Sequence, residues 1–228
     1  MSKKGGSGHI KRLAASNYLK VNRKASKFIA RPNPGRHSLA MSIALITFLK
    51  EKLSQMSAKE ARKVIASGGI EVNGKQVKDP KFPLGFNDII YIKPEDIYYK
   101  ITSGKYGVIS FEKVSKENAS KNIFKVVGKY TAKGGKIMLR LHNGNIIEGS
   151  NEIKVNDSVV LQEGKLEKVL KFENGARCMV YMGVHAPETG KIVKINKGGM
   201  LSRESVEVKS DRGEGFETVA KNIIVIGA

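Results

Sequence analysis

The sequence has a single cysteine and no tryptophan. With only Cys178 available, no intrachain disulfide can form, which is typical of proteins in a reducing compartment. The apolar context "ARCMVYM" predicts that this thiol is a buried structural residue. Aromatic residues are only 7% of the chain, and there are 24 glycines. This composition favours several small modules joined by turns over one large sandwich.

Long hydrophobic runs are also missing. The longest run, "LAMSIALITFL" from Leu39 to Leu49, is too short to cross a bilayer. The start of the chain, "MSKKGGSGHIKRL", is charged and is not followed by the apolar stretch of a signal peptide. We therefore expect a soluble, cytoplasmic protein without a membrane partner.

Acidic residues are absent from the first part of the chain, where Glu51 is the first. Lysine and arginine total 41 against 21 Asp plus Glu, which gives a formal net charge of +20. This imbalance predicts a polyanionic partner. Residues 1–37 combine Gly, Pro and basic residues without an extended apolar face. We expect a basic arm there, with one short helix near Leu13 to Leu19, that is largely disordered until a partner orders it.

Patterns for catalysis and metal binding are missing too. The four histidines are scattered, and none has the spacing of a metal motif. The Gly-rich stretches "KGGKI" (133–137) and "NKGGML" (196–201) do not complete a phosphate-binding loop and are read as hairpin turns. No paired acid and base is marked. We therefore predict no catalytic residues, no metal, no cofactor and no small-molecule substrate.

Residues 38–94 are typical of a helix–helix–hairpin unit. Apolar residues at three- and four-residue spacing predict a first amphipathic helix from Ser38, with Leu39, Ile43, Ile46, Leu49 and Leu53 on one face. After a break at residues 54–56, "SAKE" (57–60) is a capping box that begins a second helix. This helix buries Ala61, Val64 and Ile65 and ends at Ser67-Gly68-Gly69.

Basic residues gather on the exposed parts of this unit. Lys59, Arg62 and Lys63 form one stripe on the second helix. The following hairpin turns at Asn73-Gly74, a favoured two-residue turn. Its lysines (Lys75, Lys78, Lys81) face away from its apolar residues. We predict that the stripe and the hairpin lysines line one groove.

Short strands dominate after Pro94. They are "YYKI", "GVISF", "IFKVVGKY", "KIMLRL", "SVVL" and "LKF", with a short helix expected over 115–121, and then "ARCMVYM", "GKIVKI", "SVEV", "FETV" and "NIIVIG". The fold class is therefore α+β and mainly β, built of several modules. The expected parts are a basic arm (1–37), the small helix–helix–β domain (38–94), a central β domain (95–173) and an SH3-like barrel (174–228).

The class of polyanion follows partly from chemistry. Few aromatics argue against a platform on which successive single-stranded bases stack. No helix-turn-helix or zinc finger supports major-groove reading of DNA. Folded RNA is bound mainly through shape, phosphate and 2′-hydroxyl contacts, which suits basic residues spread over several modules. Structured RNA is thus favoured. A DNA-compacting protein and an RNA-modifying enzyme with a targeting domain are the alternatives.

Residues 43–92, with "SAKEARKVIASGGIEVNGKQV", closely resemble the small RNA-binding domain named after the bacterial small-subunit ribosomal protein four. The whole chain is similar to the e-type small-subunit ribosomal protein four family of archaea and eukaryotes. The matching stretches follow the family order: "GHIKRLAA" (8–15), "ARPNPGRHSL" (30–39), "FPLGFNDII" (82–90), "IKVNDSVVL" with "FENGARCMV" (153–180) and "NIIVIG" (222–227). The sequence stops after "VIG" without the basic tail of eukaryotic members, so it resembles the archaeal form.

The resemblance implies a non-catalytic constituent of the small ribosomal subunit, active in translation. It implies binding to the five-prime domain of the ribosomal RNA beside neighbouring ribosomal proteins, and a C-terminal KOW domain of SH3-like fold. Carried over residue by residue, the implied RNA-binding positions are Lys59, Arg62, Lys63, Asn73 and Lys75, with Lys11, Arg12, Arg31 and Arg36 in the arm.

Two stretches depart from the family pattern. Family members have Pro and a nearby Trp after "KRLAA", where this chain has "SNYL" (16–19). A KOW turn is commonly rich in Gly, Asn and Arg, whereas the turn "MGVHAPETGK" (182–191) has Val184, Pro187 and Glu188 at its tip, with only Lys191 close by. We therefore do not expect this turn to contact phosphate.

Overall fold

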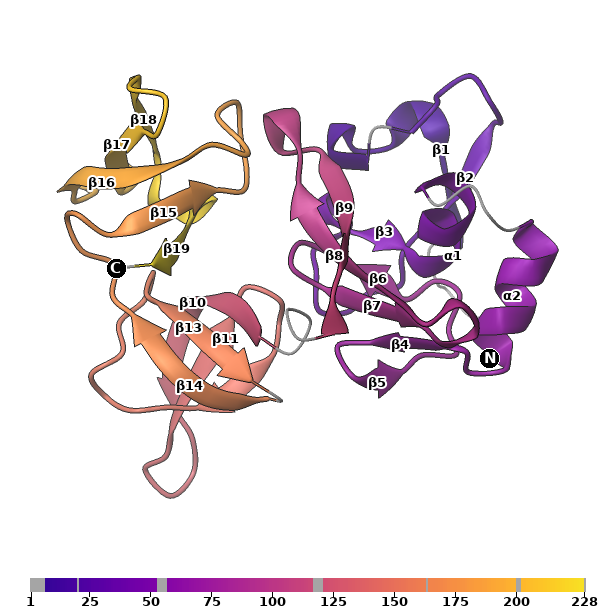
Figure 1. The fold of residues 1–228 in the computed structure, drawn as a ribbon, viewed down its shortest axis with the longest axis horizontal. Helices are drawn as coiled ribbons and strands as arrows, with labels where there is room; N and C mark the ends of the chain where they lie inside the picture. Colours follow the sequence, from indigo (N-terminus) through magenta and orange to yellow (C-terminus); the bar gives the residue numbers. More distant parts are fainter. Residues whose placement is uncertain are drawn as a thin grey trace. The chain divides into compact units, whose positions relative to one another are not determined.

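The computed structural model describes residues 7–19, 21–52, 57–116, 121–162, 164–199 and 202–227. Most of its regular elements are strands (Figure 1). The chain divides into two compact units. The first holds the described residues up to Ile101 together with Phe111–Val114, and the second holds Thr102–Ser110 and the described residues from Ser115 onward. The fold is therefore mainly β, as the sequence predicts.

The arm has regular structure, unlike the disorder expected for it. Strands β1 (His9–Lys11) and β2 (Phe28–Ala30) pair antiparallel, with Ile10 opposite Ile29. Two short 3-10 helices, Arg12–Ala14 and Asn17–Leu19, lie between them. Buried apolar residues within the arm, namely Ala15, Leu19 and Ile29, anchor it. Ala15 and Leu19 have helical spacing, but Ile29 lies ten residues further on, so the three do not form one periodic pattern.

The first amphipathic helix is shorter than predicted. Leu39–Met41 form a 3-10 turn, and Leu39 is 45% exposed. Strand β3 (Ile43–Ala44) then pairs with β6 (Pro83–Leu84), so the helix begins only at α1 (Leu45–Thr47) and continues as a π-helix over Phe48–Lys52. The helical spacing of the apolar residues does not reveal β3, because its partner β6 lies far along the chain. Leu53 and the break at 54–56 lie outside the described residues.

The second helix and the hairpin agree with the prediction. Helix α2 (Ala58–Ala66) begins with the capping box: Ser57 Oγ accepts from the Glu60 amide (3.2 Å), and Glu60 Oε2 accepts from the Ser57 amide (2.8 Å). Strands β4 (Ile70–Val72) and β5 (Lys75–Gln76) flank the turn. Both turn residues have positive φ, 51° at Asn73 and 73° at Gly74, as this two-residue turn requires.

The sheet of the first unit continues past the boundary expected at residue 94. Its order is β5-β4-β7-β8-β9, with β7 (Ile89–Ile92), β8 (Ile97–Ser103) and β9 (Ile109–Val114). A tight turn over Lys93–Glu95, with Asp96 in the left-handed conformation, returns β8 onto β7. Strands after Pro94 therefore extend this sheet, while the division into four domains stays a prediction.

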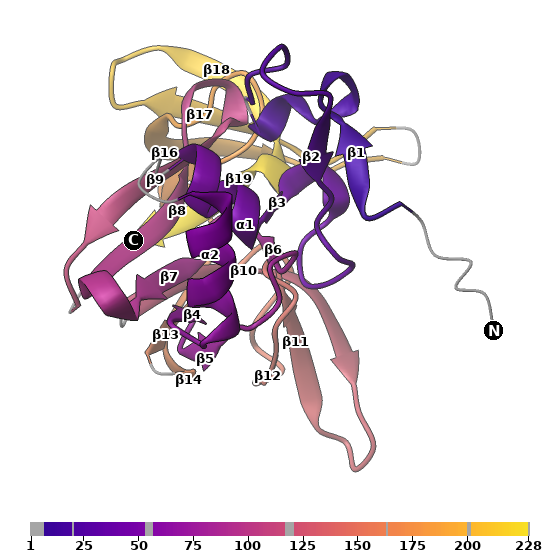
Figure 2. The ribbon, with the colours of Figure 1, turned by 90° about the vertical axis from the view of Figure 1, so that its right-hand side faces the viewer.

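The second unit contains two five-stranded antiparallel sheets. The order of the first is β12-β11-β10-β13-β14. Its strands are β10 (Lys121–Thr131), β11 (Ile137–Leu141), β12 (Ile146–Glu148), β13 (Ser158–Gln162) and β14 (Lys165–Leu170). The β10–β11 hairpin projects away from the rest of its sheet (Figure 2). Most of the helix expected over 115–121 lies outside the described residues, and Lys121 begins β10.

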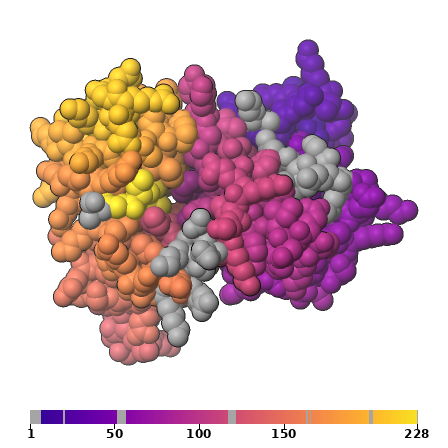
Figure 3. Space-filling view, viewed as in Figure 1, coloured from indigo at the N-terminus to yellow at the C-terminus, as the bar shows by residue number. Residues whose placement is uncertain are grey.

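The order of the C-terminal sheet is β18-β17-β16-β15-β19. Its strands are β15 (Arg177–Val180), β16 (Thr189–Asn196), β17 (Ser205–Ser210), β18 (Gly215–Val219) and β19 (Ile223–Gly227). These residues form one contiguous body in the space-filling view (Figure 3, orange to yellow). Cys178 is buried in its core, as predicted, and burial raises the pKa of the thiol to about 11.

A buried lysine joins the two sheets of the second unit. Lys125 on β10 is 2% exposed, and its Nζ donates to the carbonyl oxygens of Ala220 (2.5 Å) and Ile223 (2.8 Å). Burial lowers the pKa of this amine to about 8. The cost of holding a charge here is offset only in part by the two carbonyl dipoles and the nearby Glu204.

We expect the stability of the second unit to rise with pH because of Lys125. Its pKa is about 8 in the folded state and about 10.4 when the chain is unfolded. Between these values the unfolded chain binds more protons, so stability rises by at most about 1.4 kcal/mol per pH unit. The rise can be measured by urea unfolding from pH 7.5 to 10.5. Over this range wild type should gain stability relative to Lys125→Met. The control variant Lys133→Met, which replaces an exposed lysine, should behave like wild type. Parallel profiles for all three would contradict it.

Candidate nucleic-acid interface

Helix α2 presents the basic stripe predicted from the sequence. Ala61 and Ile65 are buried and Val64 is half-buried, so these three positions form the face of the helix that packs on the core. Lys59, Arg62 and Lys63 are all exposed. None of the three forms an ion pair with any described residue. Lys63 lies near enough to Glu60 to lower the pKa of that carboxylate, but three exposed cations on one helix still form a surface suited to phosphate groups.

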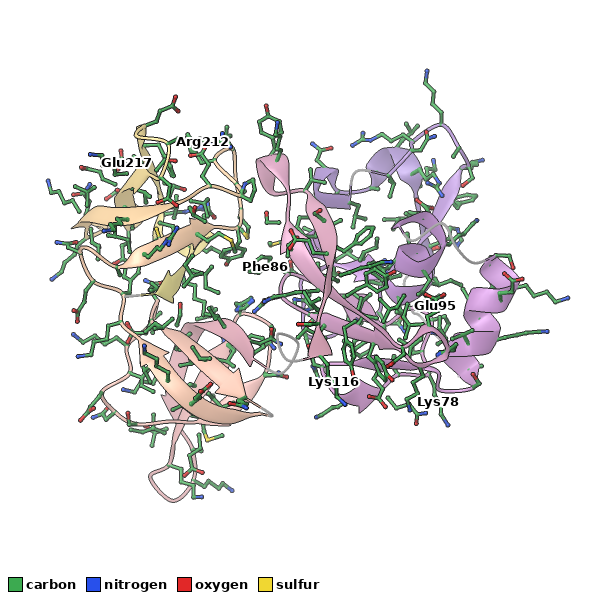
Figure 4. All side chains as sticks on the ribbon, in the orientation of Figure 1. Lys78, Phe86, Glu95, Lys116, Arg212 and Glu217 are labelled. Carbon is green, nitrogen blue, oxygen red and sulfur yellow. The ribbon has the colours of Figure 1, made fainter. Side chains whose placement is uncertain are left out.

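The hairpin adds further cations beside this helix. Lys75 and Lys78 are exposed, and Figure 4 shows Lys78 near the β4–β5 end of the sheet. Gln76 Nε2 donates to the carbonyl oxygen of Gly68 at the end of α2, 2.9 Å away, which ties the hairpin to the helix. Helix and hairpin are therefore held together, while their arrangement as one RNA groove stays a prediction.

Asn73 has a structural role in the hairpin. Its side-chain oxygen accepts from the Ile89 amide (3.0 Å), and its Nδ2 donates to Asp88 Oδ1 (2.7 Å). Both polar atoms of the amide thus have partners within the protein. The sequence interpretation, which placed Asn73 among the RNA contacts, missed this internal use. The residue fixes the turn that carries Lys75.

Asp88 is the centre of a buried network that no motif in the sequence reveals. Its carboxylate also accepts from the Gly85 amide (2.9 Å) and from Nε2 of His37 (2.8 Å), and both side chains of this last pair are almost fully buried. A Cβ at Gly85 would lie 2.3 Å from His37 Nδ1, so only glycine fits. The end of the arm is therefore locked onto the hairpin unit.

A second set of contacts holds the end of the arm against the segment that follows the hairpin. Asn33, in "RPNPGRH", donates through Nδ2 to Asp79 Oδ2 (2.7 Å) and through its backbone amide to the Lys81 carbonyl (2.9 Å). Arg31 and His37 also line a pocket of about 380 Å³ at this point. Both Arg31 and Arg36 are half-buried. The arm therefore presents its arginines from a fixed segment.

Arg12 is used internally. It is 5% exposed and forms a two-pronged ion pair with Glu51, with Nη1 3.2 Å from Oε2. Its Nε also donates to Ser26 Oγ (2.7 Å), and Nη1 donates to the Asn22 carbonyl (3.1 Å). The guanidinium thus holds the arm against the helical segment. Its neighbour Lys11 is exposed and keeps its charge available.

Other kinds of site have no support in the described parts of the chain. No group of three or more His, Cys, Asp or Glu residues there has an arrangement that could hold a metal ion. None of the helices described is both long enough and apolar enough to span a membrane. The cations of α2, the hairpin and the arm are thus the main chemical feature of the first unit.

Comparison with known proteins identifies three family segments. The model of ribosomal family S4e matches residues 95–166, the S4 domain matches residues 45–90, and the RS4NT domain matches residues 4–40. The S4 domain match covers α1, α2 and the hairpin. The RS4NT match covers the arm, including Arg12, Arg31 and His37.

Full-length relatives agree with these segments. The chain is 37% identical to small ribosomal subunit protein eS4 of Archaeoglobus fulgidus, over 96% of this chain and 93% of that protein. It is 34% identical to the eS4 protein of Methanocella arvoryzae, over 96% and 94%. The crystal structure of 30S ribosomal protein S4e from Thermoplasma acidophilum matches with a TM-score of 0.70 and 30% identity, covering 82% of this chain and 96% of that one. This chain therefore belongs to the ribosomal protein family S4e.

Proposed function

We propose that this chain is a constituent of the small ribosomal subunit that binds and stabilises folded ribosomal RNA. The observation that carries the proposal is the set of exposed, unpaired cations on α2 and the hairpin, within the segment that matches the S4 domain. Its relatives are named small ribosomal subunit proteins. The protein acts in the cytoplasm, in contact with ribosomal RNA and neighbouring ribosomal proteins, and it has no catalytic role.

The proposal includes the finer points inferred from the sequence. The target is the five-prime domain of the small-subunit RNA, and the C-terminal sheet is an SH3-like KOW domain. The direct RNA contacts are Lys59, Arg62, Lys63 and Lys75, with Lys11, Arg31 and Arg36 in the arm. Asn73 and Arg12 act by positioning these contacts, since their side chains bind within the protein.

Equilibrium binding over a salt series tests this function. The chain should prefer a five-prime-domain RNA fragment to unrelated structured RNA of equal length and to duplex DNA, and it should keep this preference at high salt. Charge-driven binding weakens with log salt in proportion to the phosphates neutralised, roughly 0.7 to 0.9 per contact. If all three curves coincide and fall together, only nonspecific charge is at work, and the proposal is wrong.

Charge reversal on α2 should weaken this binding specifically. We expect Arg62→Glu with Lys63→Glu to lower affinity for the fragment about 10- to 100-fold and to reduce the salt slope by roughly 2. Both side chains are exposed, so the thermal unfolding curve should not change. The matched control is Lys168→Glu with Lys171→Glu, the same charge change on exposed residues of the second unit. Equal losses for both double variants would refute the α2 assignment.

A further inference from the structure

A pocket of about 320 Å³ lies in the second unit where three turns meet. The first turn, Lys105–Gly107, joins β8 and β9. The second, 182–188, joins β15 and β16, and the third, 211–214, joins β17 and β18. The pocket has no part in the basic surface of α2. All of its lining residues belong to the second compact unit.

The turns that form the pocket are packed closely against one another. The amide of Tyr106 donates to the Ala186 carbonyl, 3.0 Å away. Gly107 has φ 73°, and a Cβ there would lie 3.2 Å from the backbone nitrogen of Gly183. On the far side of the second turn, the rings of His185 and Phe216 stack at 4.2 Å. The pocket is therefore a built feature of the unit.

The rim of the pocket carries an exposed aromatic ring. Tyr106 is 73% exposed, and its backbone is in the left-handed region with φ 61° and ψ 24°. A bulky residue in this region is an outlier, and such outliers concentrate at binding sites. Val184, another lining residue, is also 73% exposed. The fold thus holds a large ring in solvent, in a conformation that costs free energy.

Charges around the ring are arranged unevenly. Lys105 and Arg212 are exposed cations of the lining, and Figure 4 shows Arg212 at the turn between β17 and β18. The carboxylate of Asp211 accepts from Thr189 Oγ1 (2.6 Å) and from Arg177 Nη2 (3.0 Å), and these contacts hold its pKa below the usual value. Its charge is thus compensated. Glu188 also lines the pocket, so phosphate fits at the two cations and not at the centre.

We infer that this pocket binds one unpaired nucleotide of the RNA, with its base stacked on Tyr106 and its phosphates beside Lys105 and Arg212. A neutral planar base with polar edges suits a wall made of an aromatic ring and a valine, and unstacked bases of folded RNA are commonly held on tyrosine. The inference rests on the proposed RNA-binding function and extends it to a second type of contact. The low aromatic content argues against a platform for many bases, but one exposed ring is enough for one base.

A matched pair of RNA hairpins isolates this contact. The two hairpins have the same stem and loop, and one carries a single bulged 2-aminopurine nucleotide. The full chain should bind the bulged hairpin more tightly, and the 2-aminopurine fluorescence should be quenched. Tyr106→Ala should reduce affinity for the bulged hairpin about 5- to 150-fold, the range for loss of one stacked base. Its affinity for the paired hairpin should not change.

Variants separate stacking from charge. Tyr106→Phe keeps the ring and should retain the preference for the bulge. Lys105→Gln with Arg212→Gln should lower the salt slope for the bulged hairpin by at most about 2. The control Tyr130→Ala removes another partly exposed tyrosine, on β10 outside the pocket, and should have no effect.

Two results would overturn the inference: an unchanged preference for the bulge in Tyr106→Ala, or equal losses in Tyr106→Ala and Tyr106→Phe. The first result would indicate that the pocket binds a neighbouring protein and not a nucleotide. Neither result affects the five-prime-domain assay, which depends on α2 and the arm. A failure of that assay with an intact, Tyr106-dependent preference for the bulge would instead refute only the ribosomal target.

Discussion

Replacing Asp88 with alanine should lower the free energy of unfolding of the first unit by about 5 kcal/mol, since it removes three hydrogen bonds to a charged group and each is worth about 1.5 to 3 kcal/mol. The carboxylate is 1% exposed and accepts from His37, Asn73 and the Gly85 amide. Its loss leaves three donors without an acceptor away from water. Urea unfolding measures the change, and Asp88→Asn, which keeps one accepting oxygen, should give an intermediate loss.

Asp79 is the matched control for this experiment. It is an exposed aspartate of the same unit, and it also accepts two hydrogen bonds, from Asn33 Nδ2 (2.7 Å) and from the Lys81 amide (2.9 Å). Because water can replace these contacts, Asp79→Ala should cost only about 1 kcal/mol. If the two alanine variants lose the same stability, burial of the Asp88 network does not matter. The network would then be a minor contact.

Replacing Arg12 with alanine should destabilise the arm by about 3 kcal/mol, because removing one partner of a buried pair leaves an uncompensated charge. The charge that loses its partner is the carboxylate of Glu51, whose side chain is 20% exposed. Hydrogen exchange should speed up in β1 and β2, and urea unfolding should shift to lower concentration. Arg12→Lys keeps the charge but not the two-pronged geometry, so it should recover only part of the loss.

The Arg12→Ala variant also distinguishes between two roles of Arg12, namely direct contact with an RNA phosphate and positioning of the arm. A direct phosphate contact would appear as a salt slope for RNA binding lowered by roughly 1, with unchanged stability. A positioning residue would show lost stability instead. Arg23→Ala is the control, since Arg23 lies in the same arm, is exposed, and among the described residues donates hydrogen bonds only to Asn17 Oδ1 and the Leu13 carbonyl. Equal stability of the Arg12 and Arg23 variants would contradict the positioning role of Arg12.

Local features were predictable because their causes lie within a few residues. The capping box starts α2, and Asn73-Gly74 makes the hairpin turn with positive φ at both positions. Alternation of apolar residues located most strands of the second unit, although it missed β12 and placed β14 late. The motif order identified the family, which the full-length relatives confirm.

The sequence by itself determined the mainly β class, the basic surface of α2 and the family. The class and the basic surface depend on composition and on short-range periodicity, and the family depends on the order of the sequence stretches that resemble it. Only the tertiary structure decided that β3 interrupts the first helix, that Asp88 locks the arm to the hairpin, and that Arg12 pairs with Glu51. Each of these depends on residues about 40 to 50 positions apart in the chain. Local patterns contain no information on such contacts, because burial and distance arise only when the chain has folded.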